Sequence, residues 1–178
     1  MSRNYGKWYA SALRSSFRSS SDIRAVKGIW LPCVIATRSL FCMPAPTPYL
    51  HFAGNARDAL AFYGDVFGCA VHLHTFEEFN RTDGPADAIA HGYLVDGPVS
   101  LFAADIAGDQ LALHCEGMML SLLGAVEDLS LRDWFASLSA GGRIVDDLQM
   151  RPWGASDGQV IDRFGLHWLI GFGDDESG

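Results

Sequence analysis

The histidines of this chain are the side chains whose type and spacing could do chemistry. His72, His74 and Glu78 form a His-x-His-x-x-x-Glu motif. Two residues at i and i+2 share one face of a β-strand, and imidazole and carboxylate groups are common zinc ligands. The motif could therefore hold a metal ion. We favour a simpler interpretation, a solvated strand with polar residues along its rim, because a second histidine-bearing motif does not follow downstream.

The segment Gly154–Gly158 has the Gly-x-Ser-x-Gly spacing of a hydrolase nucleophile. Such an elbow needs a strand before it, a helix after it and a histidine later in the chain. Here the β-prone segment Gln159–Asp162 follows, and the later His167 lies in a strand-like run. We therefore interpret Gly154–Gly158 as a hairpin turn rather than a catalytic serine.

The composition indicates one globular domain. The chain has 178 residues, of which 49% are hydrophobic and 19% are charged. Residues 43–178 contain six arginines, no lysine and twenty acidic residues, a net charge of −14. Phosphate groups are bound mainly by Lys and Arg, so this charge argues against a nucleic-acid or anionic-membrane partner. The four cysteines have no Cys-x-x-Cys spacing, which fits a reducing, cytoplasmic location.

Residues 1–42 differ from the rest of the chain. They are rich in Arg and Ser and carry a net charge of +6, with Asp22 as the single acidic residue. An organellar transit peptide would have this composition. We favour the interpretation that translation begins at Met43, so that the basic leader is disordered or foreign to the native protein. The domain is then expected over 43–173, with an acidic tail over 174–178.

From Met43 onward the hydrophobic pattern is regular. Helices are predicted at Ala56–Phe67, with Asn55 as the N-cap and Gly68 as the stop, and at Leu129–Ala140. The predicted strands, read from period-2 patterns and turn residues, are Tyr49–Ala53, Ala70–Phe76, Ala88–Val95, Val99–Ala104, Met118–Leu123, Ile144–Leu148, Gln159–Asp162 and Leu166–Phe172.

This order is a β-α-β-β-β unit used twice. Tyr63 and Trp134 lie 71 positions apart in the two predicted helices. We predict an α+β domain in which tandem modules form a cupped mixed sheet with the helices on its outer face. One helix covers only one face of a sheet, so the other face must be buried by the second module or by a ligand.

Three segments resemble the PhnB-like branch of the vicinal-oxygen-chelate superfamily, which includes glyoxalases, bleomycin resistance proteins and dioxygenases. They are PYLHFAGNARDALAFYGDVFG, DAIAHGYLVDGPVSLFAAD and RPWGASDGQVIDRFGLHWLI. The resemblance implies a cup that holds a small molecule and, in the metalloenzymes, a divalent ion held by one side chain from each of four strands. These ligand positions fall here on Pro48, Phe102, a residue near Leu120, and Leu169. None of these side chains binds a divalent metal, so we expect neither a metal site nor a cofactor.

Strand alternation predicts what replaces the metal site. Leu50 and Phe52 are expected to share a face with the lost ligand positions, and His51 to point away from it. The predicted ligand-binding residues are Phe52, His91, Phe102, Trp153, His167 and Leu169, with Trp153 as a lid aromatic. Such a cup would be mostly apolar, as small-molecule pockets usually are. The same residues could instead be packing core between the modules, and His91 could be purely structural.

Three functions remain open at this point. The leading hypothesis is metal-free binding of a small, partly apolar molecule, in a sequestration or accessory role. The second is a lyase or dioxygenase of glyoxalase type, with a metal relocated to His91, His167 or His51. The third is a structural dimer module without a ligand. The resemblance also implies a homodimer.

Overall fold

The computed structural model describes residues 46–173, which belong to one compact unit of the chain. The predictions for the basic leader and the acidic tail lie outside the described residues. The described elements are, in chain order, β1 (Tyr49–Phe52), α2 (Ala56–Phe67), β2 (Ala70–Thr75), β3 (Ile89–Val95), β4 (Phe102–Asp105), β5 (Leu120–Leu123), α3 (Asp128–Ser139), β6 (Arg143–Met150), β7 (Ser156–Ile161) and β8 (His167–Phe172).

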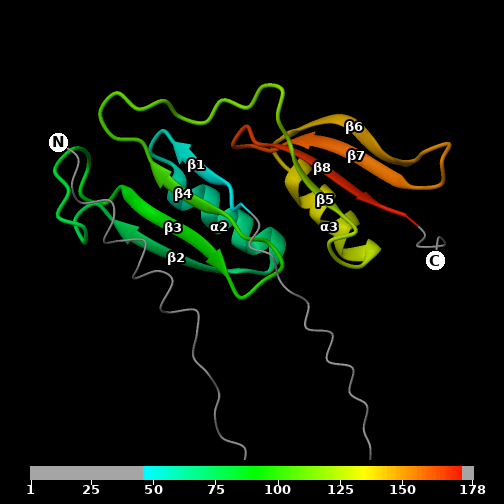
Figure 1. The fold of residues 1–178 in the computed structure, drawn as a ribbon, viewed down its shortest axis with the longest axis horizontal. Helices are drawn as coiled ribbons and strands as arrows, with labels where there is room; N and C mark the ends of the chain where they lie inside the picture. Colours follow the sequence, from blue (N-terminus) through cyan, green and yellow to red (C-terminus); the bar gives the residue numbers. More distant parts are fainter. Residues whose placement is uncertain (1–45, 174–178) are drawn as a thin grey trace, which may run out of the picture. The chain divides into compact units, whose positions relative to one another are not determined.

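The strands form two separate four-stranded mixed sheets (Figure 1). Sheet A has the order β1-β4-β3-β2, and sheet B has the order β5-β8-β7-β6. In each sheet the first strand of the module runs parallel to the last strand, and the other neighbours are antiparallel. The two sheets thus share one topology, and the α+β fold of two β-α-β-β-β modules is confirmed.

Helix α2 follows the predicted bounds, but a different residue caps it. Asn55 occupies the N-cap position and makes no side-chain capping hydrogen bond. The backbone N–H of Ala56 donates instead to Oδ1 of Asp105, at 2.9 Å, and the N–H of Ile89 donates to Oδ2, at 2.8 Å. The negative charge of a carboxylate near a helix N-terminus also interacts favourably with the helix dipole and stabilises the helix. Asp105, at the end of β4, therefore ties the start of α2 to its own sheet.

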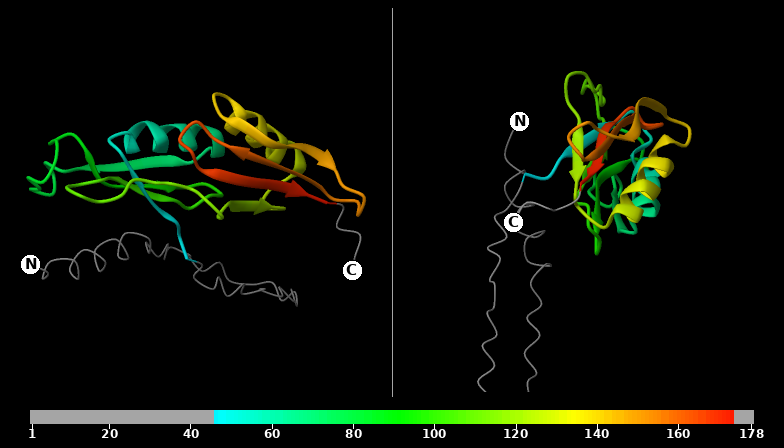
Figure 2. Two further views of the ribbon diagram at one scale, coloured as in Figure 1. Left: turned by 90° about the horizontal axis from the view of Figure 1, so that it is seen from above. Right: turned by 90° about the vertical axis from the view of Figure 1, so that its right-hand side faces the viewer.

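Both helices lie on the same side of the two sheets (Figure 2). They cover a shared core that contains Leu60, Tyr63 and Phe67 from α2, and Trp134 and Leu138 from α3. The rings of Phe67 and Trp134 meet edge to face, with centroids 5.0 Å apart. Among the described residues, no helix covers the opposite face of either sheet, and we call this face the open face of the sheet.

A buried aspartate joins the two modules. Asp162 follows β7 and is 3% exposed. Its Oδ2 accepts hydrogen bonds from the hydroxyl of Tyr63 in α2 and from Nε1 of Trp168 in β8, each at 2.8 Å. Its Oδ1 accepts from the backbone N–H groups of Phe164 and Leu166, at 2.8 and 3.1 Å. One carboxylate therefore shapes the β7–β8 turn and holds it to the first module.

The ring of Phe164, at the tip of this turn, also enters the first module. It packs against Phe52, Phe62 and Tyr63, with centroid distances from 5.6 to 6.1 Å. Burial raises the pKa of the Tyr63 phenol above its ordinary range, and the nearby Asp162 carboxylate raises it further. Tyr63 thus remains a protonated donor to Asp162.

The predicted starts of two strands are each three residues away from the observed ones. β4 begins at Phe102 rather than Val99, because the register with β3 starts at the Tyr93–Phe102 pair, and Asp96, with a positive φ of 54°, lies in the preceding turn. β7 begins at Ser156, three residues before the predicted start, because Ser156 pairs with Phe172. Among the described residues, no helix is long and apolar enough to cross a membrane.

Candidate functional site

The open face of sheet A carries a continuous group of rings, which we call the ring face. Its strands lie side by side, so alternate residues on each strand point to the same surface. Register pairs Tyr49 with Phe102, Phe102 with Tyr93, and His74 with His91. The ring face comprises Tyr49, His51, His72, His74, His91, Tyr93 and Phe102.

The rings touch one another across the strands. His72 stacks on Tyr93, with centroids 5.3 Å apart and an angle of 10° between the ring planes. His91 lies 5.4 Å from Tyr93 and 5.5 Å from Phe102. Tyr49 meets the ring of His51 edge to face at 5.4 Å. The surface therefore offers ring faces and edges with imidazole and phenol groups among them, rather than a purely aliphatic patch.

His91 occupies the middle of the ring face and has a defined partner. The hydroxyl of Tyr49 lies 3.0 Å from Nδ1 of His91. Burial lowers the pKa of His91, and the nearby His74 lowers it further. A neutral imidazole has one donor and one acceptor nitrogen. Because a phenol is the natural donor to a neutral imidazole, we assign Nδ1 as the acceptor, which leaves the proton on Nε2.

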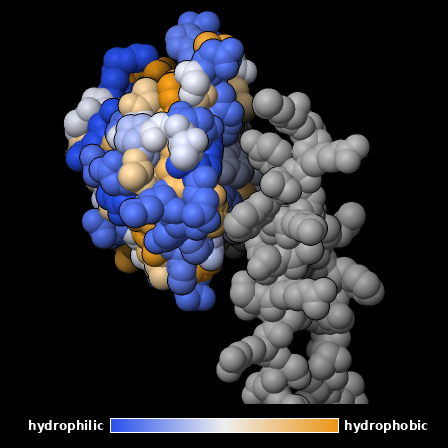
Figure 3. Space-filling model, turned by 90° about the vertical axis from the view of Figure 1, so that its left-hand side faces the viewer, coloured by the Kyte–Doolittle hydropathy of each residue, from blue (hydrophilic) through white to orange (hydrophobic). Residues whose placement is uncertain are grey.

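His74 and Glu78 of the His-x-His-x-x-x-Glu motif do interact. Nδ1 of His74 and Oε2 of Glu78 are 3.3 Å apart, and Oε2 also accepts from the backbone N–H of Thr75 at 3.3 Å. The His74 ring stacks on Phe79. Seen from the left-hand side of Figure 1, hydrophobic residues are interspersed among hydrophilic ones (Figure 3). The motif thus forms the polar rim of a strand, as the sequence predicts.

The structure corrects the predicted face of β1. Leu50 and Phe52 are 4% and 3% exposed and belong to the core beneath α2. They point away from Phe102, whereas Tyr49 and His51 share its face. Leu50 and Phe52 share a face, as strand alternation predicts, but this is the core face, so the predicted face of β1 is one residue out of register. Phe52 therefore does not lie on the ring face, and His51 does.

His167 and Leu169 lie on the other sheet. They occupy the open face of sheet B, where register pairs them with Ile161 and Gln159. Ser121, rather than Leu120, shares this face with Leu169, because Leu120 packs against the core. Nε2 of His167 is buried and makes no hydrogen bond among the described residues. Of the predicted site residues, His91 and Phe102 thus lie on the open face of sheet A, whereas His167 and Leu169 lie on that of sheet B.

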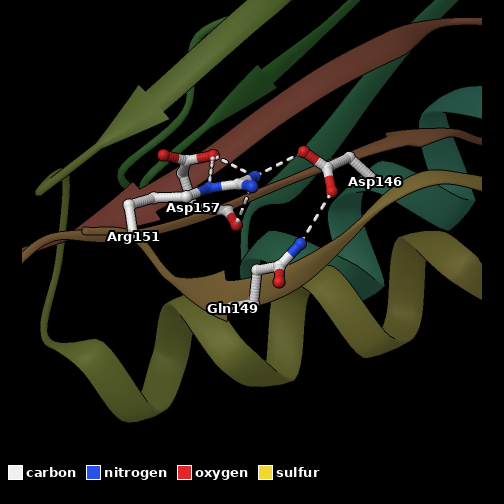
Figure 4. Close-up of polar contacts among 4 residues, drawn as sticks. All are labelled: Asp146, Gln149, Arg151 and Asp157. Atoms are coloured by element: carbon white, nitrogen blue, oxygen red, sulfur yellow. Dashed lines mark hydrogen bonds and ion pairs between the residues drawn. The ribbon is translucent and has the colours of Figure 1, made fainter.

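Trp153 lies at the tip of the β6–β7 hairpin and is 72% exposed. The base of this hairpin is held by Arg151, which forms ion pairs with Asp146 and Asp157 (Figure 4). Nε of Arg151 donates to Oδ1 of Asp157 at 2.9 Å, and Nε2 of Gln149 donates to Oδ1 of Asp146 at 3.0 Å. Hydrogen bonds from Arg151 lower the pKa of Asp146. The predicted lid residue therefore stands on a fixed hairpin.

Other candidate centres are structural. Ser156 of the Gly-x-Ser-x-Gly segment lies in β7 and pairs with Phe172, so a nucleophile elbow is absent there. A pocket of about 200 Å³ lies at the start of α2, lined by Asn55, Asp87 and Asp105 among others. Both oxygens of Asp105 are already used to hold backbone N–H groups. Within residues 46–173, no group of three or more His, Cys, Asp or Glu residues is arranged to hold a metal ion.

Sequence reasoning missed most of the ring face. It identified His91 and Phe102 but not Tyr49, Tyr93 or His72. The signal was available, since His72 and His74 alternate on β2, and His91 and Tyr93 alternate on β3. What could not be read from one sequence was the register that places these pairs on one surface.

Comparisons with known proteins agree with this fold. No family model matches the chain. Protein YjdN of Escherichia coli (strain K12) is 29% identical over 137 residues, which cover 70% of this chain and 92% of YjdN. The solved protein PA1353 from Pseudomonas aeruginosa is 28% identical, with a TM-score of 0.62, and covers 74% of this chain and 98% of its own. A PhnB protein from Bacillus cereus is 19% identical, with a TM-score of 0.62, over 72% of this chain and 99% of its own.

The described domain is thus an α+β domain of two β-α-β-β-β modules, in which each sheet has one open face. The described domain shares this fold with protein PA1353 and with the PhnB protein. A fold does not fix a function, so function has to be argued from the ring face itself.

Proposed function

We propose that this protein binds a small, partly apolar molecule on the ring face without a metal ion, in a sequestration or accessory role. The single observation that carries the proposal is the set of seven rings from four strands on a face that no described helix covers. Aromatic side chains with polar edges are typical of small-molecule sites, because they supply contact area and a few hydrogen bonds together.

The predicted residues of sheet B enter the same proposal. If the open face of sheet B from one chain lies over the ring face of another chain, three predicted residues would contact the bound molecule: His167, Leu169 and the lid residue Trp153. We propose that a second copy of the chain supplies that cover, as a homodimer, and that the chain belongs to the PhnB-like branch. Exposed apolar residues of the second module, Leu123 and Val145 among them, support such a contact. Light scattering coupled to size exclusion should give twice the chain mass, and the mass of one chain would contradict the homodimer.

A cytoplasmic location is part of the proposal. Cys69 and Cys115 are both free thiols in the structure. Free cysteines fit a reducing compartment, where disulfides are rare.

Calorimetric titration of the full chain with 2-naphthalenemethanol tests the binding proposal. This probe is neutral and partly apolar, and saturable binding with one site per chain is expected. Phe102→Ala should weaken it by about fivefold or more, since it removes a central ring contact worth about 1 kcal/mol or more. Leu129→Ala, on the exposed surface of α3, is the control and should bind as the wild type does. Equal affinity for the two variants would contradict the proposal.

A metal-dependent lyase or dioxygenase of glyoxalase type is the second candidate. The observation that favours it is the corrected face of β1, which brings His51 to the same surface as His91, on either side of Tyr49. Two imidazoles could contribute to a zinc or similar site. Elemental analysis of the purified chain decides between the candidates. A stoichiometric divalent ion that is lost in His91→Ala would overturn metal-free binding.

A further inference from the structure

The ring face also constrains the chemical class of its ligand. This step rests on the binding function proposed above and asks what the molecule must be. The stacked pairs His72–Tyr93 and His74–Phe79 have interplanar angles of 10° and 18°. Flat rings already stack on this surface, so a planar aromatic molecule would find the geometry that such pairs prefer.

The hydrogen-bonding group at the centre of the ring face is a donor. With Nδ1 of His91 accepting from Tyr49, Nε2 carries the remaining proton and faces away from Tyr49. The ligand group opposite that nitrogen must be an acceptor. Glu78 is the carboxylate at the rim, and its oxygen is already engaged by His74 and by the backbone of Thr75. The donor on Nε2 of His91 therefore favours an acceptor group on the ligand over a second donor.

From these contacts we infer that the ligand is a planar aromatic monoanion, such as an aryl carboxylate or phenolate, which lies on the rings and accepts a hydrogen bond from Nε2–H of His91. Its aromatic part replaces solvent over Tyr93 and Phe102. Its oxygen satisfies the central imidazole donor. A hydrogen bond between a neutral donor and an ionised acceptor is stronger than one between neutral groups.

Because the ligand is an anion and the ring face contains imidazoles, its affinity should depend on pH. The titratable groups around His91 are Tyr49 and His51 on β1, His72 and His74 on β2, and Glu78 at the rim. Histidine is the side chain type that gains a proton between about pH 8 and pH 5, so a face with four imidazoles becomes more positive as the pH falls. An aromatic anion should then bind more tightly at pH 6.0 than at pH 8.0, and a neutral aromatic molecule should not.

The experiment compares 2-naphthoate with 2-naphthalenemethanol by calorimetric titration of the full chain at pH 6.0 and 8.0. We expect naphthoate to bind at least about fivefold more tightly than the alcohol at pH 6.0, with a smaller ratio at pH 8.0. His91→Phe keeps a ring and removes the donor, so it should reduce the ratio of naphthoate affinity to alcohol affinity by about fivefold. His114→Phe, in the exposed segment after β4, is the matched control and should behave as the wild type does.

The outcomes separate the inference from the proposed function. If both probes bind with equal, pH-independent affinity, or if His91→Phe keeps the full naphthoate preference, the anion inference is overturned and the binding function stands. If neither probe binds the folded chain, both are overturned. Circular dichroism of each variant at both pH values confirms that the measured protein is folded.

Discussion

Tyr63 and Asp162 provide a direct test of how the two modules are held together. The substitution Tyr63→Phe removes one hydroxyl and keeps the ring with its contacts to Phe67 and Trp168. The lost interaction is a hydrogen bond of 2.8 Å to a buried carboxylate, between residues 99 positions apart. Hydrogen bonds to charged groups contribute about 1.5–3 kcal/mol, so the free energy of unfolding should fall by that amount.

Asp162 should be far more sensitive than Tyr63. Asp162→Ala leaves four donors without their acceptor, namely the buried Tyr63 hydroxyl, the buried Trp168 indole N–H and the backbone N–H groups of Phe164 and Leu166. At about 1–3 kcal/mol for each unsatisfied donor, the loss approaches the whole stability of a domain, about 5–15 kcal/mol. The milder Asp162→Asn allows measurement. In a double-mutant cycle with Tyr63→Phe it should show a coupling energy of about 1–2 kcal/mol.

Urea unfolding of the full chain, followed by far-ultraviolet circular dichroism, measures these changes. Tyr93→Phe is the matched control, because the Tyr93 ring is half-buried on the ring face and packs against His72 and His91. Its effect should stay within about 0.5 kcal/mol. A Tyr63→Phe effect no larger than that of Tyr93→Phe, or a coupling energy near zero, would refute the central role of Asp162.

Three further substitutions test separate parts of the fold. Asp105→Ala removes the acceptor for the N–H groups of Ala56 and Ile89 and should lower the free energy of unfolding by about 2–5 kcal/mol, measured by urea titration. Gly92→Ala places a Cβ against Leu60 and Leu73 and should cost about 1–3 kcal/mol in the same assay; an unchanged midpoint would contradict the close packing of α2 on β3. The pKa of His91 is lower in the folded state, so the unfolded chain binds a proton at this imidazole more readily. The stability that neutral His91 provides is therefore complete above about pH 6.5 and is lost as the pH falls below that value. His91→Phe should therefore make the melting temperature less sensitive to pH between 7.5 and 5.5, and an unaltered pH profile would contradict the shift.

The repeat made the fold predictable from the sequence. Helix α2 follows the predicted bounds because its apolar stripe has helical spacing and Gly68, with a φ of 65°, adopts the left-handed conformation that ends it. Asp105 could not be recognised as the cap from sequence spacing, because it lies 49 residues from Ala56. Local signals specify an element, whereas its partners depend on which strands become neighbours.

The candidate site shows the same limit more sharply. A shift of one residue moves every side chain of a strand to the other face. That shift in β1 placed Phe52 on the predicted binding surface and removed His51 from it. Phe102 and His91, both predicted to bind the ligand, lie on one surface with ring centroids 5.5 Å apart, and their role in binding stays a prediction.

The segment after β4 also affects how this protein behaves in solution. The N–H of Leu113 donates to the carbonyl oxygen of His51 at 2.6 Å, on the side of β1 that does not face β4. The unpaired backbone groups of an edge strand can pair with a strand of another chain, which is a route to aggregation. Because this segment returns along β1, it occupies part of that strand's free edge and prevents another strand from pairing there. Shortening it would remove that protection even if every ring remained in place.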